Sequence, residues 1–160
     1  MTKTKEIGSK KKKKIVSQIV APSISDQVIF DSIQFIAEDQ ENVKELIYNR
    51  KYEVTFFRFE NKYYPVISFI RENPTIDFPS VQVDEGALTH ILNGADIFTQ
   101  GITSVDRKFE PNTIVMIINP QNTVISLGKS IMSSEDLLTS KGKGILNIHY
   151  ITDDIWNGKI

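Results

Sequence analysis

The sequence predicts an α+β protein with two small domains, an α/β domain first and a mixed β domain with short helices second. Its 160 residues, 40% hydrophobic and 24% charged, can bury a core and leave room for two such domains. The X-Pro steps Asn73-Pro74 and Phe78-Pro79 disfavour helix and mark a linker between the domains. Seven of the eight glycines follow residue 79, as is typical of a small compact β domain. We therefore assign residues 21–79 to the first domain and residues 80–160 to the second.

Residues 1–20 form a basic arm in front of an acidic body. They hold seven lysines against Glu6 alone, a net charge of +6, whereas the remaining residues hold 12 basic and 19 acidic side chains, a net charge of −7. Five adjacent ammonium groups repel one another and require water, so we expect the arm to be disordered. The candidates for contact with a polyanion such as nucleic acid are Lys10, Lys11, Lys12, Lys13 and Lys14.

Two other interpretations of the lysine run remain open, a nuclear localisation signal and a solvated tail without a partner. Contact with RNA predicts that deletion of residues 1–14 weakens binding and flattens its dependence on salt. An unchanged salt dependence would favour the solvated tail.

The first domain contains one ambiguous segment and one clear hairpin. Residues 26–48 fit a helix capped by Asp26, and their second half either continues this helix or enters a strand. Residues 53–59 and 63–69 are rich in β-branched and aromatic side chains, and a short polar turn separates them. This pattern predicts a β-hairpin.

The second domain begins with a short helix at residues 83–94. Asp84 is placed to cap its first turn, and Gly94 is placed to close it in a left-handed conformation. The elements expected after it are a hairpin of residues 113–119 and 123–128, a short helix opened by Ser133 with Asp136, and a last strand at residues 145–151.

The composition excludes several classes of protein. Cysteine is absent, which removes disulfide scaffolds, thiolate zinc sites, CxxC redox chemistry and cysteine nucleophiles, and favours an intracellular setting. The longest aliphatic run, Ile114–Ile118, is far shorter than the roughly 20 residues that span a bilayer. The sequence therefore predicts no transmembrane helix.

Reactive side chains that could act together are scarce. His90 and His149 are the two histidines, and neither has the spacing of a metal-binding motif. His149 with Asp153 resembles a general base with its orienting carboxylate, but strand alternation favours a half-exposed histidine. Gly142 and Gly144 fit a bend in a β-barrel better than a phosphate-binding loop. The sequence thus predicts no catalytic residue, no metal site and no cofactor.

A set of motifs in the second domain resembles the PUA domain, the RNA-binding fold of pseudouridine synthases and archaeosine transglycosylases. These motifs are Val83–Ala87, Asn93–Ile97, Gly101-Ile102, Phe109–Val115, Ser126–Ser130 and Lys141–Ile145. They extend over about residues 80–157. The resemblance implies a PUA-type mixed β-barrel with short helices.

A longer set of motifs is similar to the malignant T-cell-amplified sequence protein family. It comprises Phe56–Arg58, Tyr63–Pro65, Val81–Asp84, Gly101–Ser104, Met132–Asp136, Asn147–Tyr150 and Asp153–Trp156, whereas residues 1–40 match poorly. Members join an N-terminal α/β domain to a C-terminal PUA domain. The resemblance implies a noncatalytic, cytoplasmic translation factor that binds the small ribosomal subunit and pairs with the density-regulated protein. Reinitiation and the removal of deacylated tRNA during ribosome recycling are its implied tasks.

The PUA resemblance also implies an RNA-binding groove. The candidate residues are Gly86, Gly94, Gly101, Arg107, Lys108 and Lys129. The glycines would let the main chain approach RNA, although turn geometry explains them equally well, and the cations would contact phosphate. Residues 80–160 hold nine acidic and six basic side chains, a net charge of −3, so we do not expect this domain alone to bind RNA tightly.

Two other functions remain as alternative hypotheses. One is a PUA-containing accessory of RNA modification that recognises tRNA without ribosomes. The other is an enzyme that uses His149, Asp153 and Asp154.

Overall fold

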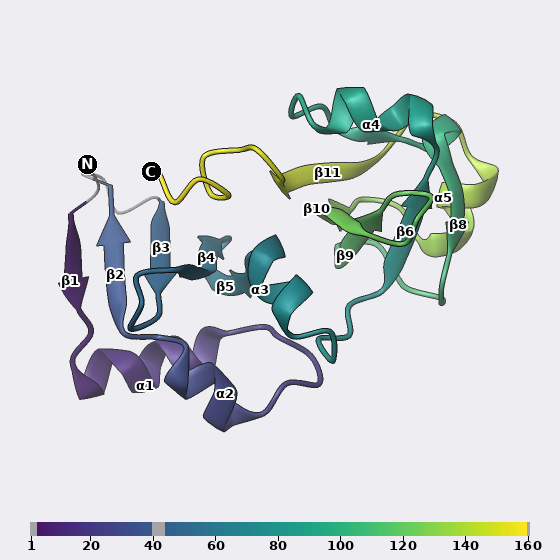
Figure 1. The fold of residues 1–160 in the computed structure, drawn as a ribbon. Coiled ribbons are helices and arrows are strands. Elements are labelled where there is room, and N and C mark those ends of the chain that lie inside the picture. The colour runs from purple at the N-terminus through teal and green to yellow at the C-terminus, as the bar shows by residue number, and fades with distance from the viewer. Residues whose placement is uncertain (1–2, 40–43, 160) are drawn as a thin grey trace. The chain divides into compact units, whose positions relative to one another are not determined.

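The computed structural model describes residues 3–39 and 44–159 and consists of two compact units. Unit 1 runs to Asp77 and is completed by the C-terminal residues from Asp154, whereas unit 2 comprises Phe78–Asp153 (Figure 1). The observed units therefore differ from the expected domains at the C-terminal end, because the last residues join unit 1. There the Tyr48 hydroxyl donates a hydrogen bond to the carbonyl of Gly158 at 3.1 Å.

Unit 1 is built on a five-stranded antiparallel sheet with strand order β1-β2-β3-β4-β5. Its strands are β1 (Thr4–Glu6), β2 (Phe35–Glu38), β3 (Glu45–Tyr48), β4 (Val54–Phe59) and β5 (Lys62–Pro65). Its helices are α1 (Ser9–Gln18), α2 (Asp26–Asp31) and α3 (Ile67–Glu72), and α1 and α2 lie beside each other (Figure 1). Among the helices of the described residues, none is long and apolar enough to cross a membrane.

The basic segment is ordered, so the expectation of a disordered arm is wrong for residues 4–18. β1 pairs antiparallel with β2, and the five lysines lie within α1. Ile7 and Ile15 are buried, and the amide of Val20 donates to the carbonyl of Tyr63 at 2.8 Å. Burial of two isoleucines and pairing with strands far away in the sequence hold the segment in place in spite of its charge.

The ambiguous segment at residues 26–48 contains both a helix and strands. α2 is short, and its N-cap is Ser25 rather than Asp26, because the Ser25 hydroxyl accepts the hydrogen bond from the amide of Val28 at 3.2 Å. The chain then enters β2 and returns as β3, whose residues are all buried. The part of the prediction that concerned residues 41–43 lies outside the described residues.

The first predicted hairpin is confirmed for β4 and β5. Glu60 and Asn61 have φ angles of 50° and 65°, the left-handed pair that a two-residue turn needs to match the strand twist. The second strand is shorter than expected, because it ends at Pro65 and α3 follows. Ile67 and Ile70 are buried three residues apart, a spacing that suits one face of a helix.

Unit 2 is built on a six-stranded mixed sheet with strand order β7-β11-β10-β9-β6-β8, in which β6 and β9 are parallel. Its strands are β6 (Ser80–Val83), β7 (Ile97–Phe98), β8 (Ile102–Val105), β9 (Thr113–Ile118), β10 (Val124–Ser130) and β11 (Lys143–Tyr150). Its helices are α4 (Glu85–Ile91), the 3-10 turn η1 (Thr99–Gly101) and α5 (Ser134–Thr139). The predicted α+β class is confirmed.

The local signals in unit 2 acted as expected. The Asp84 side chain caps α4, the Ser133 hydroxyl caps α5, and Gly94 has a φ of +90°. The predicted hairpin is confirmed as β9 and β10. The buried side chains of α4 and α5 pack with those of the sheet in one core, which fixes α4 above the strands.

Three buried tyrosines make the stability of unit 1 dependent on pH. Burial raises the pKa of Tyr48 and of Tyr64, and burial together with a hydrogen bond to Glu45 raises the pKa of Tyr63. The folded chain therefore holds these protons more tightly than the unfolded chain, in which tyrosine titrates near pH 10.0. The resulting stabilisation is complete below pH 10.0 and is lost as the pH rises above it.

We expect the free energy of unfolding of unit 1 to fall as the pH is raised above 10.0. Trp156 is the single tryptophan and belongs to unit 1, so its fluorescence in denaturant reports this transition. A Tyr63→Phe variant should show a weaker pH dependence, because it has no hydroxyl to titrate. An unfolding midpoint that stays constant over this pH range would contradict the expectation.

Candidate functional site

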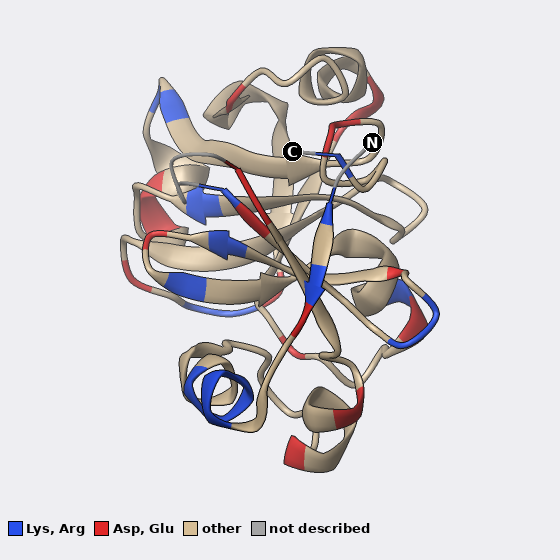
Figure 2. Cartoon of the chain, turned by 90° about the vertical axis from the view of Figure 1, so that its left-hand side faces the viewer, with Lys and Arg blue, Asp and Glu red and all other residues tan. Residues whose placement is uncertain are grey.

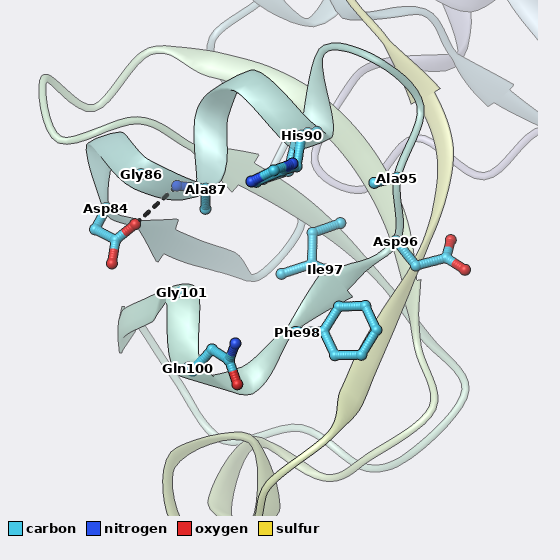
Figure 3. A pocket seen from close by; sticks show the side chains of 11 residues that line it. Asp84, Gly86, Ala87, His90, Ala95, Asp96, Ile97, Phe98, Gln100 and Gly101 are labelled. Carbon is cyan, nitrogen blue, oxygen red and sulfur yellow. Dashed lines mark hydrogen bonds between the residues drawn. The ribbon is translucent and has the colours of Figure 1, made fainter.

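Unit 2 has a cavity of about 530 Å³ between α4 on one side and the segment from Ala95 to Gly101 on the other (Figure 3). α4 and its N-cap form the first wall, and β7 and η1 form the second. Every element that lines the cavity belongs to unit 2. The site is therefore complete within this unit.

The N-terminal end of α4 is fixed directly to η1. Asp84 Oδ1 accepts a hydrogen bond from the amide of Ala87 at 2.9 Å, and the amide of Asp84 donates to the carbonyl of Gly101 at 2.9 Å. A Cβ added at Gly101 would lie 2.9 Å from the Cβ of Ala87, closer than two carbons can approach. Glycine at position 101 thus allows the two walls to meet at this end of the cavity.

The other end of the cavity is fixed by Asn147, which lies on β11. Its Nδ2 donates to the carbonyls of Ile91 and Ala95, both at 3.0 Å, and its Oδ1 accepts from the Ser126 hydroxyl at 2.8 Å. The backbone amide of Asn147 donates to Asp96 Oδ1 at 2.9 Å. One side chain thus ties the turn after α4 to the sheet.

The cavity presents aromatic and polar groups to a ligand. The Phe98 side chain is 46% exposed, although an aromatic ring this large is usually buried, and His90 on α4 is also exposed. Figure 3 shows the rings of His90 and Phe98 and the side chain of Ile97 around the space between the two walls. Exposed rings beside polar groups can stack on a nucleobase and hydrogen-bond to its edge.

The carboxylates of the cavity are already engaged. Asp84 caps α4, and Asp96 Oδ2 lies 3.1 Å from the ammonium of Lys143 on β11. Lys143 is directly opposite Phe98 in the pairing of β11 with β7. This lysine brings a positive charge to the edge of a cavity that otherwise carries acidic groups.

The structure separates the six predicted RNA-binding residues. Gly86 and Gly101 line the cavity, whereas Gly94 closes α4 behind it and packs against the Tyr150 ring. Arg107 pairs with the adjacent Asp106 at 2.7 Å, and Lys108 is exposed in the same loop.

Lys129 lies on β10, opposite Leu146 of β11. None of the three predicted cations therefore lines the cavity, so the expected grouping of cations with glycines is not found there.

Sequence reasoning did not indicate that His90, Phe98 and Gln100 line a cavity, nor that Lys143 and Asn147 contact Asp96 at its edge. The exposure of Phe98 could not be predicted, because its strand has two residues and is too short to show an alternating pattern. Asn147 lies more than 50 positions from its backbone partners Ile91 and Ala95. No local pattern signals such a contact.

His149 is fully buried, so the expectation of a half-exposed histidine is wrong. Its Nδ1 lies 2.9 Å from Asp153 Oδ2, which also accepts the hydrogen bond from the amide of Tyr150 at 2.9 Å. The pair closes the turn after β11 and does not line the cavity beside α4. Within residues 3–39 and 44–159, no three His, Asp or Glu side chains are grouped so that they could hold a metal ion.

Comparison with known proteins relates the chain to a domain family and to two groups of named relatives. The family model of the PUA domain matches residues 79–151. Malignant T-cell-amplified sequence 1 of Rattus norvegicus is 39% identical over 113 residues, which cover 67% of this chain and 62% of the rat protein. Translation machinery-associated protein 20 of Saccharomyces cerevisiae is 32% identical over 120 residues, or 69% of this chain and 65% of the yeast protein. The match thus spans somewhat less than two thirds of the length of these relatives.

Two solved structures share the fold. A hypothetical protein of Pyrococcus horikoshii superposes with a TM-score of 0.76 at 22% identity, over 99% of this chain and 100% of that one. A conserved PUA domain protein of Thermoplasma acidophilum superposes with a TM-score of 0.70, also at 22% identity and with the same coverage. The PUA-type architecture predicted for the second domain is therefore confirmed.

Proposed function

Since this chain belongs by homology to the malignant T-cell-amplified sequence family and contains a PUA domain, we propose that it is a noncatalytic RNA-binding factor of translation. Its site of action is the small ribosomal subunit, in the cytoplasm. The observation that carries the proposal is the cavity of unit 2, where exposed rings and polar groups converge in a domain that matches an RNA-binding family. The similarity to translation machinery-associated protein 20 supports the assignment to translation.

The finer part of the proposal concerns the step and the partners. The factor acts in reinitiation and ribosome recycling, contacts ribosomal RNA or deacylated tRNA through unit 2, and pairs with a homologue of the density-regulated protein. An RNA-binding factor needs no catalytic group. The His149–Asp153 pair is buried and stabilises the turn after β11, so its presence is explained without a catalytic role.

Retention on purified ribosomal subunits tests this proposal. We expect the full chain to stay with small subunits at physiological salt and to be retained more strongly when the density-regulated partner is added. Crosslinking should recover ribosomal RNA. Recovery of tRNA without ribosomal RNA would replace the proposal with a role in RNA modification, and failure to bind both the subunit and the partner would refute it.

The Phe98→Ala variant tests the cavity itself. Loss of a stacked base costs about 1–3 kcal/mol by alanine substitution, so we expect RNA affinity to fall roughly 5- to 150-fold. Phe98 pairs with β11 through its backbone, so the sheet should survive the change. Leu138→Ala is the matched control, because Leu138 is exposed on α5 of the same unit and does not line the cavity. Equal affinity of the two variants for RNA would show that the Phe98 ring does not contact it.

A further inference from the structure

α1 concentrates positive charge on one side of unit 1. It carries Lys10 to Lys14 on consecutive positions, and Figure 2 shows it end-on as a blue helix. Ile15, which is 2% exposed, anchors it on the sheet. The lysines are therefore held on a folded scaffold and not spread along a loose chain.

This charge is unfavourable for the helix itself. The first turn contains no acidic residue, although a helix N-terminus favours negative charge. Lys10 and Lys14 are four residues apart, and Lys11 and Lys14 are three apart, so like charges face one another. The positive charge of these lysines thus opposes formation of α1. A bound anion would neutralise this charge and remove the cost.

The protein itself supplies little neutralisation. Lys11 pairs with Glu38 at 2.7 Å, and the ammonium of Lys12 lies 3.9 Å from the centre of the Phe30 ring. Burial lowers the pKa of Lys12. Within the described parts of the chain, the ammonium groups of Lys10, Lys13 and Lys14 have no acceptor.

Three of these lysines border a groove of about 780 Å³. Lys10, Lys11 and Lys14 lie on the α1 side, and Glu45, Arg58 and Tyr63 come from β3, β4 and β5. Glu45 is held by Arg58 at 2.8 Å and by the Tyr63 hydroxyl at 2.9 Å, so its charge is already compensated. Four cations thus line the groove against one carboxylate.

We propose that this groove binds the phosphodiester backbone of RNA, as a second contact formed by residues separate from the cavity of unit 2. The inference rests on the proposed function, since residues 80–160 carry a net charge of −3 and an RNA-binding chain of this kind needs cations elsewhere. Lysines are point charges that suit sequence-independent contacts to phosphate. An acidic protein segment is the alternative ligand that the experiment must separate.

The test compares single lysines on the same helix. Lys10→Gln and Lys14→Gln remove charges that line the groove, whereas Lys13→Gln removes a charge on the same helix that is also exposed but does not line the groove. Glutamine is a good helix former, and circular dichroism confirms that the fold is retained. Deletion of residues 1–14 is unsuitable, because it would remove β1 and more than half of α1.

Binding of the full chain to polyuridylate is measured over a range of salt concentrations, with polyglutamate of equal charge as the second probe. We expect each groove variant to reduce the slope of log affinity against log salt by roughly 0.7 to 1, and Lys13→Gln to leave it unchanged. Equal effects of all three substitutions would overturn the proposal, because they would show that RNA is attracted to the positive charge of α1 as a whole and not bound in the groove. Tighter binding of polyglutamate with the same lysine dependence would assign the groove to an acidic protein.

The Phe98→Ala variant distinguishes failure of the groove proposal from failure of the proposed function. If wild-type chain binds RNA and loses affinity with Phe98→Ala but not with either groove variant, the groove is refuted and the function of unit 2 stands. If wild-type chain binds neither RNA nor ribosomal subunits, the proposed function is refuted, and the groove proposal with it.

Discussion

Replacing Asn147 by alanine is expected to lower the free energy of unfolding of unit 2 by about 2 kcal/mol, because the part-buried carbonyl of Ile91 and hydroxyl of Ser126 lose their partner, and a buried polar group left without a partner costs about 1–3 kcal/mol. The side chain holds the carbonyls of Ile91 and Ala95 and accepts from Ser126, which is fully buried. The turn after α4 should then move away from β11, and RNA affinity should fall as the cavity loses its shape. Denaturant unfolding followed by circular dichroism, with amide hydrogen exchange in the turn, measures both effects.

Isosteric replacement separates hydrogen bonding from packing at this position. Asn147→Asp keeps the shape of the side chain but turns a carboxylate oxygen toward two carbonyl oxygens, so it should destabilise unit 2 at least as much as alanine does. Ser126→Ala removes one of the bonds and should cost less. Asn93→Ala is the matched control, because Asn93 is exposed at the end of α4 and should have little effect. A stable Asn147→Asp variant would show that only the volume of the side chain matters.

The elements of unit 2 were predictable because their signals are local. Asp84 caps a helix whose first amides it can reach, and Gly94 ends the same helix with a positive φ. The β9–β10 hairpin likewise depends on alternation and on a turn between adjacent segments. In each case, the residues that decide the structure lie within a few positions of one another.

The structure of the basic segment was not predictable in this way. Its lysines argue for solvation, whereas the interactions that order it come from Phe35–Glu38 and Tyr63, far along the chain. The cavity shows the same limitation, since Asn147 and Lys143 meet the turn at Asp96 only after β11 has joined the sheet. Composition predicted that charge is divided between the two parts of the chain, but the structure shows which lysines share a groove.

Breaking the Arg58–Glu45 ion pair is expected to lower the free energy of unfolding of unit 1. Breaking a buried ion pair by removing one partner costs about 3–5 kcal/mol, because the other charge stays buried. The Glu45 side chain is 8% exposed and that of Arg58 is 29% exposed, which places Arg58→Met near the lower end, at about 3 kcal/mol. The Tyr63 hydroxyl, 2.9 Å from Glu45 Oε1, continues to stabilise the carboxylate and limits the loss. Denaturant unfolding followed by Trp156 fluorescence measures the loss of stability in Arg58→Met.

A double-mutant cycle distinguishes the buried charge from the lost side chain. Arg58→Met combined with Glu45→Gln removes both charges and leaves an amide oxygen that can still accept from Tyr63, so the double variant should be more stable than Arg58→Met alone. Lys62→Met is the matched control, because Lys62 is an exposed cation on the adjacent strand β5. If Arg58→Met and Lys62→Met cost the same, Glu45 is solvated in the native protein and the pair contributes no more than a surface ion pair. If only Arg58→Met is destabilising and Glu45→Gln rescues it, the Arg58–Glu45 pair that lines the groove beside α1 is a buried ion pair that holds β3 and β4 together.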